Sequence, residues 1–268
     1  MPYKTLLVHA DADDRLAARI TLAASLARAQ DARALFVYAL QAPTVMALYG
    51  EHVPASVIEM QIESERQTAA GVHAKVEEQC RREGLRMEWR QVEGSASQVL
   101  PPAGAVADLI VMGQDPADSD GSVVAEVALT AGRPILCVPH SGTFTSVGRR
   151  VLLAWNGSRR SARAAHDAIP LMRGAERVVL FAAEEDDGVA TATDAAAHLA
   201  AHGVKVELRR AHLGDLDAGT ALLNAVTDDG VDLLVMGAYG HSRFREFVFG
   251  GATRTVLGSM TVPTLLSH

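Results

Sequence analysis

Four glycines and one threonine near the end of the chain are spaced in a way that suits binding of a phosphate group. Gly237 and Gly240 follow an apolar run, and Gly250, Gly251 and Thr253 come after nine intervening residues. Because glycine has no Cβ, its backbone N–H group can approach phosphate oxygens, and a helix beginning near Gly251 adds unpaired N–H groups and the positive end of its dipole. The pattern predicts a polyphosphate site; the alternative is a strand-to-helix connection that needs positive φ angles.

The spacing of these glycines differs from both common nucleotide motifs. It is neither the GxxxxGK[ST] loop nor the GxGxxG turn, so an ordinary NTPase or dehydrogenase is not indicated. Arg243, Arg245 and Arg254 lie close enough in sequence to neutralise phosphate charge, although an exposed arginine is usually solvated surface.

No catalytic or metal-binding set is predicted. The ten histidines are scattered without HExxH spacing, and the chain has no GxSxG elbow. His241, inside the glycine loop, is the one histidine to test for chemistry. Cys80 and Cys137 are far apart with no zinc-site spacing, and Cys137 lies in an apolar run that is typical of a buried residue. We therefore expect a binding site rather than an enzyme.

The glycine loop is positioned by an alternation of short apolar runs and helical segments, which predicts βα units and parallel sheets. Runs such as residues 231–236 (VDLLVM) are almost continuously apolar, as in strands covered on both faces. Strands are predicted at residues 4–9, 34–40, 86–92, 108–112, 135–138, 149–155, 176–183, 204–209, 231–236 and 263–266. Helices are predicted at residues 14–30, 56–82, 95–107 (weaker, because two prolines interrupt it), from about 121, and at 158–172, 191–201, 217–227 and 251–259.

The chain repeats itself. Residues 6–11 (LLVHAD) are echoed at 152–157 (LLAWNG), 108–113 (DLIVMG) at 232–237 (DLLVMG), and 133–136 (RPIL) loosely at 262–265 (VPTL). Echoes in the same order indicate a duplicated domain whose copies gained and lost loops. We expect two domains, residues 1–142 and 148–268, each an open α/β sheet of five parallel strands with helices on both faces.

The first copy lacks the features that make the second a phosphate site. Its segment 114–121 is shorter than the glycine loop and carries three aspartates, which would repel a polyphosphate. Asp11 and Asp13 follow its first strand and could face a ligand or a metal, but such carboxylates are more often cap and dipole partners. Its extra residues, largely 41–67, indicate either a lid or a longer helix with a solvated loop. We predict that the first copy binds no ATP and supports the second.

The glycine pattern and the order of strands and helices resemble the universal stress protein family, specifically its tandem members with two such domains in one chain. The family pattern is Gly, two residues, Gly, nine residues, Gly and then Ser or Thr. Gly237, Gly240 and Gly250 match it, whereas Gly251 stands where Ser or Thr would be, and Thr253 could supply a hydroxyl instead. The resemblance implies two flavodoxin-like, or Rossmann-like, domains.

The resemblance also implies where an adenine nucleotide would lie. Family members hold adenine and ribose near the ends of the first and second strands, here residues 154–157 and 181–183, and commonly place an Asp where Asn156 stands. Asn156 could bind ribose or adenine through its amide, or it could cap the next helix. The implied ligand is ATP, AMP or ADP, with Mg²⁺ left open. The implied site residues are Ala154, Trp155, Asn156, Ala182, Met236, Gly237, Tyr239, Gly240, Gly250, Gly251, Ala252 and Thr253.

Composition limits the remaining partners and the location. The net charge of −7, without a run of Lys or Arg, argues against nucleic acid and anionic membranes as partners. The first residues run into a strand with no signal peptide, and no apolar stretch approaches a membrane span, so the expected location is the cytoplasm.

The expected function is stress response or signalling, with ATP selecting a conformation or a partner. The two copies would form an intrachain pseudo-dimer by pairing their terminal strands, and two chains could form a homodimer. The rival hypotheses are a slow ATPase or phosphotransferase that uses Asn156, and an interaction protein that binds no nucleotide.

Overall fold

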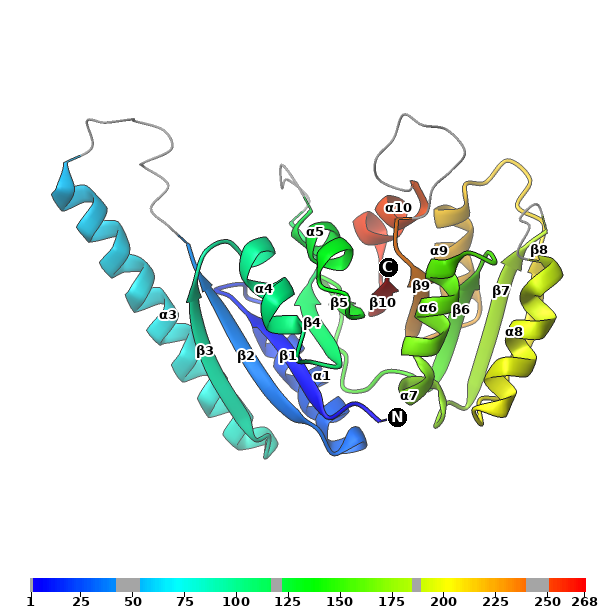
Figure 1. Cartoon of the computed structure of the whole chain (residues 1–268), viewed down its shortest axis with the longest axis horizontal. Helices are drawn as coiled ribbons and strands as arrows, with labels where there is room; N and C mark the ends of the chain where they lie inside the picture. Colours follow the sequence, from blue (N-terminus) through cyan, green and yellow to red (C-terminus); the bar gives the residue numbers. More distant parts are fainter. Residues whose placement is uncertain (1, 42–53, 117–121, 185–188, 240–250) are drawn as a thin grey trace.

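Strands and helices alternate along the chain, as the sequence predicts (Figure 1). The computed structural model describes residues 2–41, 54–116, 122–184, 189–239 and 251–268. Within them the strands are β1 Thr5–Ala10, β2 Arg33–Leu40, β3 Met87–Glu93, β4 Leu109–Gly113, β5 Ile135–Val138, β6 Arg150–Trp155, β7 Arg177–Ala183, β8 Glu207–Ala211, β9 Leu233–Gly237 and β10 Thr264–Ser267. The helices are α1 Leu16–Gln30, α3 Ala55–Glu83, α4 Ala96–Gly104, α5 Val123–Thr130, α6 Arg159–Asp167, α7 Ile169–Met172, α8 Val189–Ala201, α9 Ala218–Asp228 and α10 Gly251–Ser259.

One predicted helix is divided in two by a proline. The predicted helix 158–172 divides into α6 and α7 at Ala168, where Pro170 in the first turn of α7 has no N–H group to continue the α6 ladder. In contrast, α4 contains Pro101 and Pro102 and still begins at a capping box formed by Ser95.

All ten strands form one sheet in the order β3-β2-β1-β4-β5-β10-β9-β6-β7-β8. Neighbouring strands are parallel except at the centre, where β5 and β10 pair antiparallel with Leu136 opposite Leu265. Each half therefore has the order 3-2-1-4-5, and the open parallel α/β fold is confirmed. The pairing of the two terminal strands agrees with the predicted intrachain pseudo-dimer.

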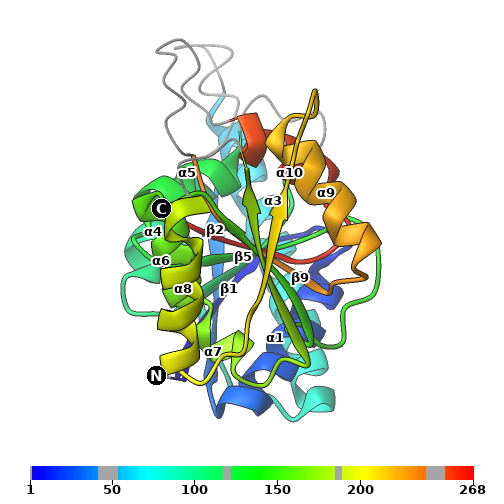
Figure 2. The same cartoon turned by 90° about the vertical axis from the view of Figure 1, so that its right-hand side faces the viewer.

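Helices cover both faces of this twisted sheet (Figure 2). Side chains from α1, α3, α6, α7 and α8 pack with one face of the strands, and side chains from α4, α5, α9 and α10 pack with the other. The central strands are almost wholly buried, whereas the edge strands β3 and β8 are largely exposed and charged. Charged edges limit pairing with other chains. No helix in the part of the chain that the structure describes has the length and apolar character needed to cross a membrane.

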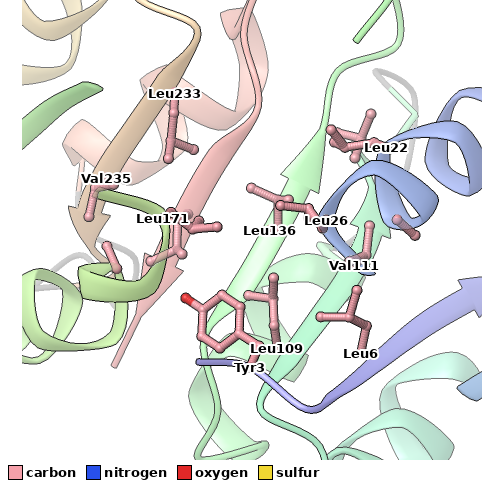
Figure 3. Packing of buried hydrophobic residues seen from close by; sticks show 14 of the residues in the cluster. Tyr3, Leu6, Leu22, Leu26, Leu109, Val111, Leu136, Leu171, Leu233 and Val235 are labelled. Carbon is pink, nitrogen blue, oxygen red and sulfur yellow. The ribbon is translucent and has the colours of Figure 1, made fainter. Parts of the chain in front are cut away.

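The two halves share one buried core at the β5–β10 junction (Figure 3). Tyr3, Leu136 and Leu171 bring together side chains from both halves there. The Tyr3 hydroxyl donates to the Asp167 carbonyl at 2.5 Å, and burial is the main cause of its raised pKa. Cys137, predicted to be buried, is fully buried on β5. The halves are therefore joined by core packing as well as by strand pairing.

The described part of the extra segment in the first half is helical. Helix α3 has 29 residues and its counterpart α8 has 13. The buried side chains of α3 begin only at Ala69, so the first turns of this helix extend past the core. Of the predicted alternatives, the longer helix accounts for residues 55–67, and residues 42–53 lie outside the described part.

Candidate functional site

A cavity of about 300 Å³ lies at the carboxyl ends of β6, β7 and β9. Strand order switches between β6 and β9, because the chain leaves β6 toward β7 on one side and places β9 on the other. Ligands of open α/β sheets bind outside the carboxyl ends of the strands at such a switch point. The volume is at the lower end of the range for small-molecule sites, about 300–1,000 Å³.

Most of the site residues predicted from the sequence come together in this cavity. Gly240 and Gly250, together with Arg243, Arg245 and His241, lie outside the described residues. Arg254 is described, but it is exposed on α10 and does not line the cavity. The predicted residues that line it are Ala154, Trp155, Asn156, Met236, Gly237, Gly251, Ala252 and Thr253.

Ala182 is a correction to the sequence prediction. Its side chain packs in the core on the opposite face of the sheet, with Leu180. Phe181 and Ala183 line the cavity instead, because successive side chains of a strand point to opposite faces. The predicted segment thus lies at the cavity, with Phe181 and Ala183 rather than Ala182 in its wall.

Gly237 is required by packing inside the protein. A Cβ added there would lie 2.7 Å from the carbonyl carbon of Arg160 and 2.8 Å from the Ser161 nitrogen. The first turn of α6 therefore packs directly against the end of β9 and brings its N–H groups to the cavity. Gly251 differs, because an added Cβ would meet no described atom within 4 Å.

Asn156 forms a turn that leads into α6. Its Oδ1 accepts a hydrogen bond from the Ser158 N–H at 3.2 Å, and the Ser158 side chain caps the helix by accepting from the Ser161 N–H at 3.2 Å. Ser158, rather than Asn156, is thus the N-cap. With Oδ1 engaged in the turn, Asn156 retains its amide N–H groups as donors to a ligand.

Thr253 and Tyr239 connect the cavity wall to the first half of the chain. The buried Thr253 hydroxyl accepts from the Tyr239 N–H at 3.1 Å, which leaves the hydroxyl proton available to donate. Tyr239 adopts a positive φ of 55°, and its hydroxyl lies near Ser122 at the start of α5. Burial is the main cause of its pKa of about 12. Tyr239 was predicted to contact nucleotide, but its ring packs in the core and does not line the cavity.

Arg160 is a cavity residue that the sequence analysis missed. It lies in the first turn of α6 and lines the cavity, and its Nε is buried without a hydrogen-bond partner among the described residues. A buried donor without a partner costs free energy, which an anionic ligand could recover. Arg159 and Arg160 look alike in sequence, and only the close approach of α6 to Gly237 distinguishes them.

The equivalent position in the first half is filled by side chains. Arg19, 1% exposed, pairs with Asp11 and lies 3.6 Å from Asp13. A Cβ added at Gly113, the counterpart of Gly237, would overlap the Arg19 guanidinium. His9 lies 3.3 Å from Asp11, and burial lowers its pKa to about 4. Asp11 and Asp13 thus serve an internal ion-pair cluster.

The described residues that follow β4 in the first half contact both α10 and the start of α5. Gln114 donates to the Leu257 carbonyl of α10 at 2.6 Å, and Asp115 accepts from Ser122 at 2.6 Å. Among the described residues no group of three His, Cys, Asp or Glu side chains could hold a metal ion.

Comparison with known proteins places the second half in a family. The sequence model of the universal stress protein family matches residues 148–268. The universal stress protein Slr1230 of Synechocystis is 40% identical over 62 residues, which are 23% of this chain. The chain spans 20% of the length of that curated relative.

Solved structures resemble the whole chain. A universal stress protein from Archaeoglobus fulgidus superposes with a TM-score of 0.79 at 17% identity, covering 98% of this chain and 95% of that one. A protein of unknown function from Pseudomonas aeruginosa superposes with a TM-score of 0.60 at 13% identity, covering 99% and 92%. At these identities the likeness establishes the fold alone. The match to the universal stress protein family model thus covers residues 148–268, and the first half of the chain repeats the fold of that domain.

Proposed function

We propose that the second half binds an adenine nucleotide, ATP in the first instance, in the cavity at the ends of β6, β7 and β9. The observation that carries this proposal is the cavity itself, since eight residues predicted from the sequence line it at the switch point of the sheet. A nucleotide needs an apolar surface for its base and donors for its phosphates, and the wall offers both kinds of group.

The base fits the apolar part of the wall, where Phe181, Leu222 and Met236 lie. The same cavity wall also offers donors, namely the N–H groups at the start of α6, the Arg160 guanidinium and the Thr253 hydroxyl. The positive end of the α6 dipole adds to the attraction for phosphate. Phosphate oxygens would also supply most ligands to any Mg²⁺ that accompanies the nucleotide.

We propose that the nucleotide acts as a signal in a stress response rather than as a substrate. Thr253 in the cavity wall bonds to Tyr239, and Tyr239 reaches Ser122 in the first half. A ligand that changes this connection would change how the two halves meet, which could select a partner or a homodimer. The proposed compartment is the cytoplasm, where ATP is available.

Calorimetric titration of the full chain with ATP, ADP and AMP tests the proposal, and Arg160→Gln serves as the site variant. We expect heat with at least one nucleotide and weaker binding in the variant. The absence of heat with all three would favour the interaction protein without nucleotide. Release of ADP from Mg-ATP that stops in the variant would favour the slow ATPase.

A further inference from the structure

A second cavity, of about 280 Å³, lies between the two halves near the amino ends of β1, β4 and β5. The first half contributes Asp108 and Arg133 to its wall, and the second contributes Arg163, His166 and His202. None of its lining residues belongs to the proposed nucleotide cavity. It is thus a separate space that exists only because the halves are joined.

The arginines of this cavity retain unused donors. Arg133 donates from Nη2 to the Ala105 carbonyl at 3.1 Å, and no ion pair of Arg133 is found in the described part of the chain. Arg163 pairs with Asp167 through Nε at 2.8 Å, and its Nη2 makes only a long contact of 3.4 Å with the Gly132 carbonyl. A guanidinium carries five N–H donors, so both side chains can bind a further acceptor.

Three histidines lie close together in the same region. The ring centroids of His166 and His202 are 6.1 Å apart, and those of His198 and His202 are 4.7 Å apart. The pKa of His202 is lowered mainly by burial and secondly by the charges of His198, His166 and Arg173. An anion placed among these groups would offset the second of these causes, the charges of His198, His166 and Arg173.

The acidic side chains of the wall, Asp108 and Asp167, already have hydrogen-bond partners. Asp108 Oδ2 accepts from the backbone N–H groups of Lys4 at 2.7 Å and Thr5 at 2.9 Å. Asp167 Oδ2 accepts from Arg163 Nε and from the Ser267 hydroxyl at 3.1 Å. No ion pair of Arg133, His166 or His202 is found among the described residues.

We propose that this cavity binds a compact oxyanion of the phosphate class, bridging the two halves. Arg133 would hold the anion from the first half, and Arg163 with His166 and His202 from the second. Arginine forks and imidazolium N–H groups match the several acceptor oxygens of a phosphate. The ligand is inorganic phosphate or the phosphate group of a small ester.

Titration calorimetry of the full chain with inorganic phosphate tests the proposal, at about pH 5 because the pKa of His202 is lowered from its ordinary value. We expect binding that weakens about tenfold or more in Arg133→Gln and in His202→Gln. Arg90→Gln, on the exposed edge strand β3, is the matched control and should bind as the unaltered chain does. Glycerol phosphate distinguishes the two sources. If it binds with higher affinity than inorganic phosphate, a phosphate ester is the preferred ligand.

Two results would overturn the proposal. One is the absence of phosphate and ester binding in the unaltered chain. The other is binding that survives both Arg133→Gln and His202→Gln but is lost in Arg160→Gln, which would assign the anion to the nucleotide cavity. If the chain binds phosphate but no nucleotide, the nucleotide proposal fails and the assignment of phosphate to this second cavity stands. The two proposals can therefore fail separately.

Discussion

Replacing Arg160 by glutamine should weaken ATP binding without weakening the fold. The Arg160 Nε is buried in the cavity wall without a described partner, so the free protein carries the cost of an unmade hydrogen bond. A hydrogen bond to a charged group contributes about 1.5–3 kcal/mol. Because Arg160 is only partly buried, the lower part of that range applies, and we expect affinity to fall by roughly 10- to 30-fold.

The same substitution should leave the free energy of unfolding unchanged within about 0.5 kcal/mol, or raise it. Glutamine removes the charge and the buried Nε while keeping a polar end that can reach solvent. Arg159→Gln is the matched control, because Arg159 is the preceding residue of the same helix, exposed and outside the cavity wall. Calorimetry with ATP and AMP gives the affinities, and urea unfolding gives the stability.

Two outcomes would refute this reasoning. If Arg159→Gln weakened ATP binding as much as Arg160→Gln, general electrostatic attraction rather than a contact would be responsible. If neither substitution changed the affinity, Arg160 would lie outside the bound ligand. A loss seen equally with AMP and ATP would place the contact near the nucleoside or the first phosphate, and a loss confined to ATP would place it near the terminal phosphates.

Three further predictions follow from the site and its counterpart. Gly251→Ser adds a hydroxyl donor at a position where an added Cβ would meet no described atom within 4 Å. Calorimetry should therefore show ATP affinity raised roughly 3- to 10-fold. Gly258→Ser, in the same helix, is the control and should leave the affinity unchanged. Thr253→Val leaves the Tyr239 N–H without its acceptor and should lower the free energy of unfolding in urea by about 1–3 kcal/mol; an unchanged urea midpoint would contradict the role of that bond. The pKa of His9 is lowered from 6.5 to about 4, so the unfolded chain binds more protons between these values. Stability should therefore fall as pH falls from about 6.5 to about 4, by up to ~3 kcal/mol, and urea midpoints should show a flatter profile in His9→Gln.

The fold was predictable because its signals are local and repeated. Apolar runs such as residues 231–236 give strands, and the echoes between the halves fix the repeat, so most elements lie within three residues of their predicted positions. The division between α6 and α7 was missed because helical periodicity continues through Ala168, and the effect of Pro170 on the ladder appears only with the backbone in place.

The site was predictable by segment and less so by side chain. The strand ends that form the cavity follow from the sheet topology, but Ala182 was chosen over Phe181 because a family pattern gives the segment without its register. Tyr239 was misplaced for a different reason. Its positive φ of 55° turns its side chain away from the cavity and toward the first half, which the glycine spacing around it does not reveal.

The two switch points of the sheet have the same topology, but the arginine near each of them is neutralised in a different way. In the first half, Arg19 enters from within α1 and its two Nη atoms face Asp11 and Asp13, so charge is neutralised inside the protein. In the second half, Arg160 stands at the start of α6, where Gly237 lets the helix pack closely and the Nε finds no partner among the described residues. A buried charge is stable only when it is paired. In the first half the Nη atoms of Arg19 are paired with carboxylates of the chain, although its Nε also lacks a partner. In the second half no ion pair of Arg160 is found among the described residues, so an anion from solution is the fitting partner.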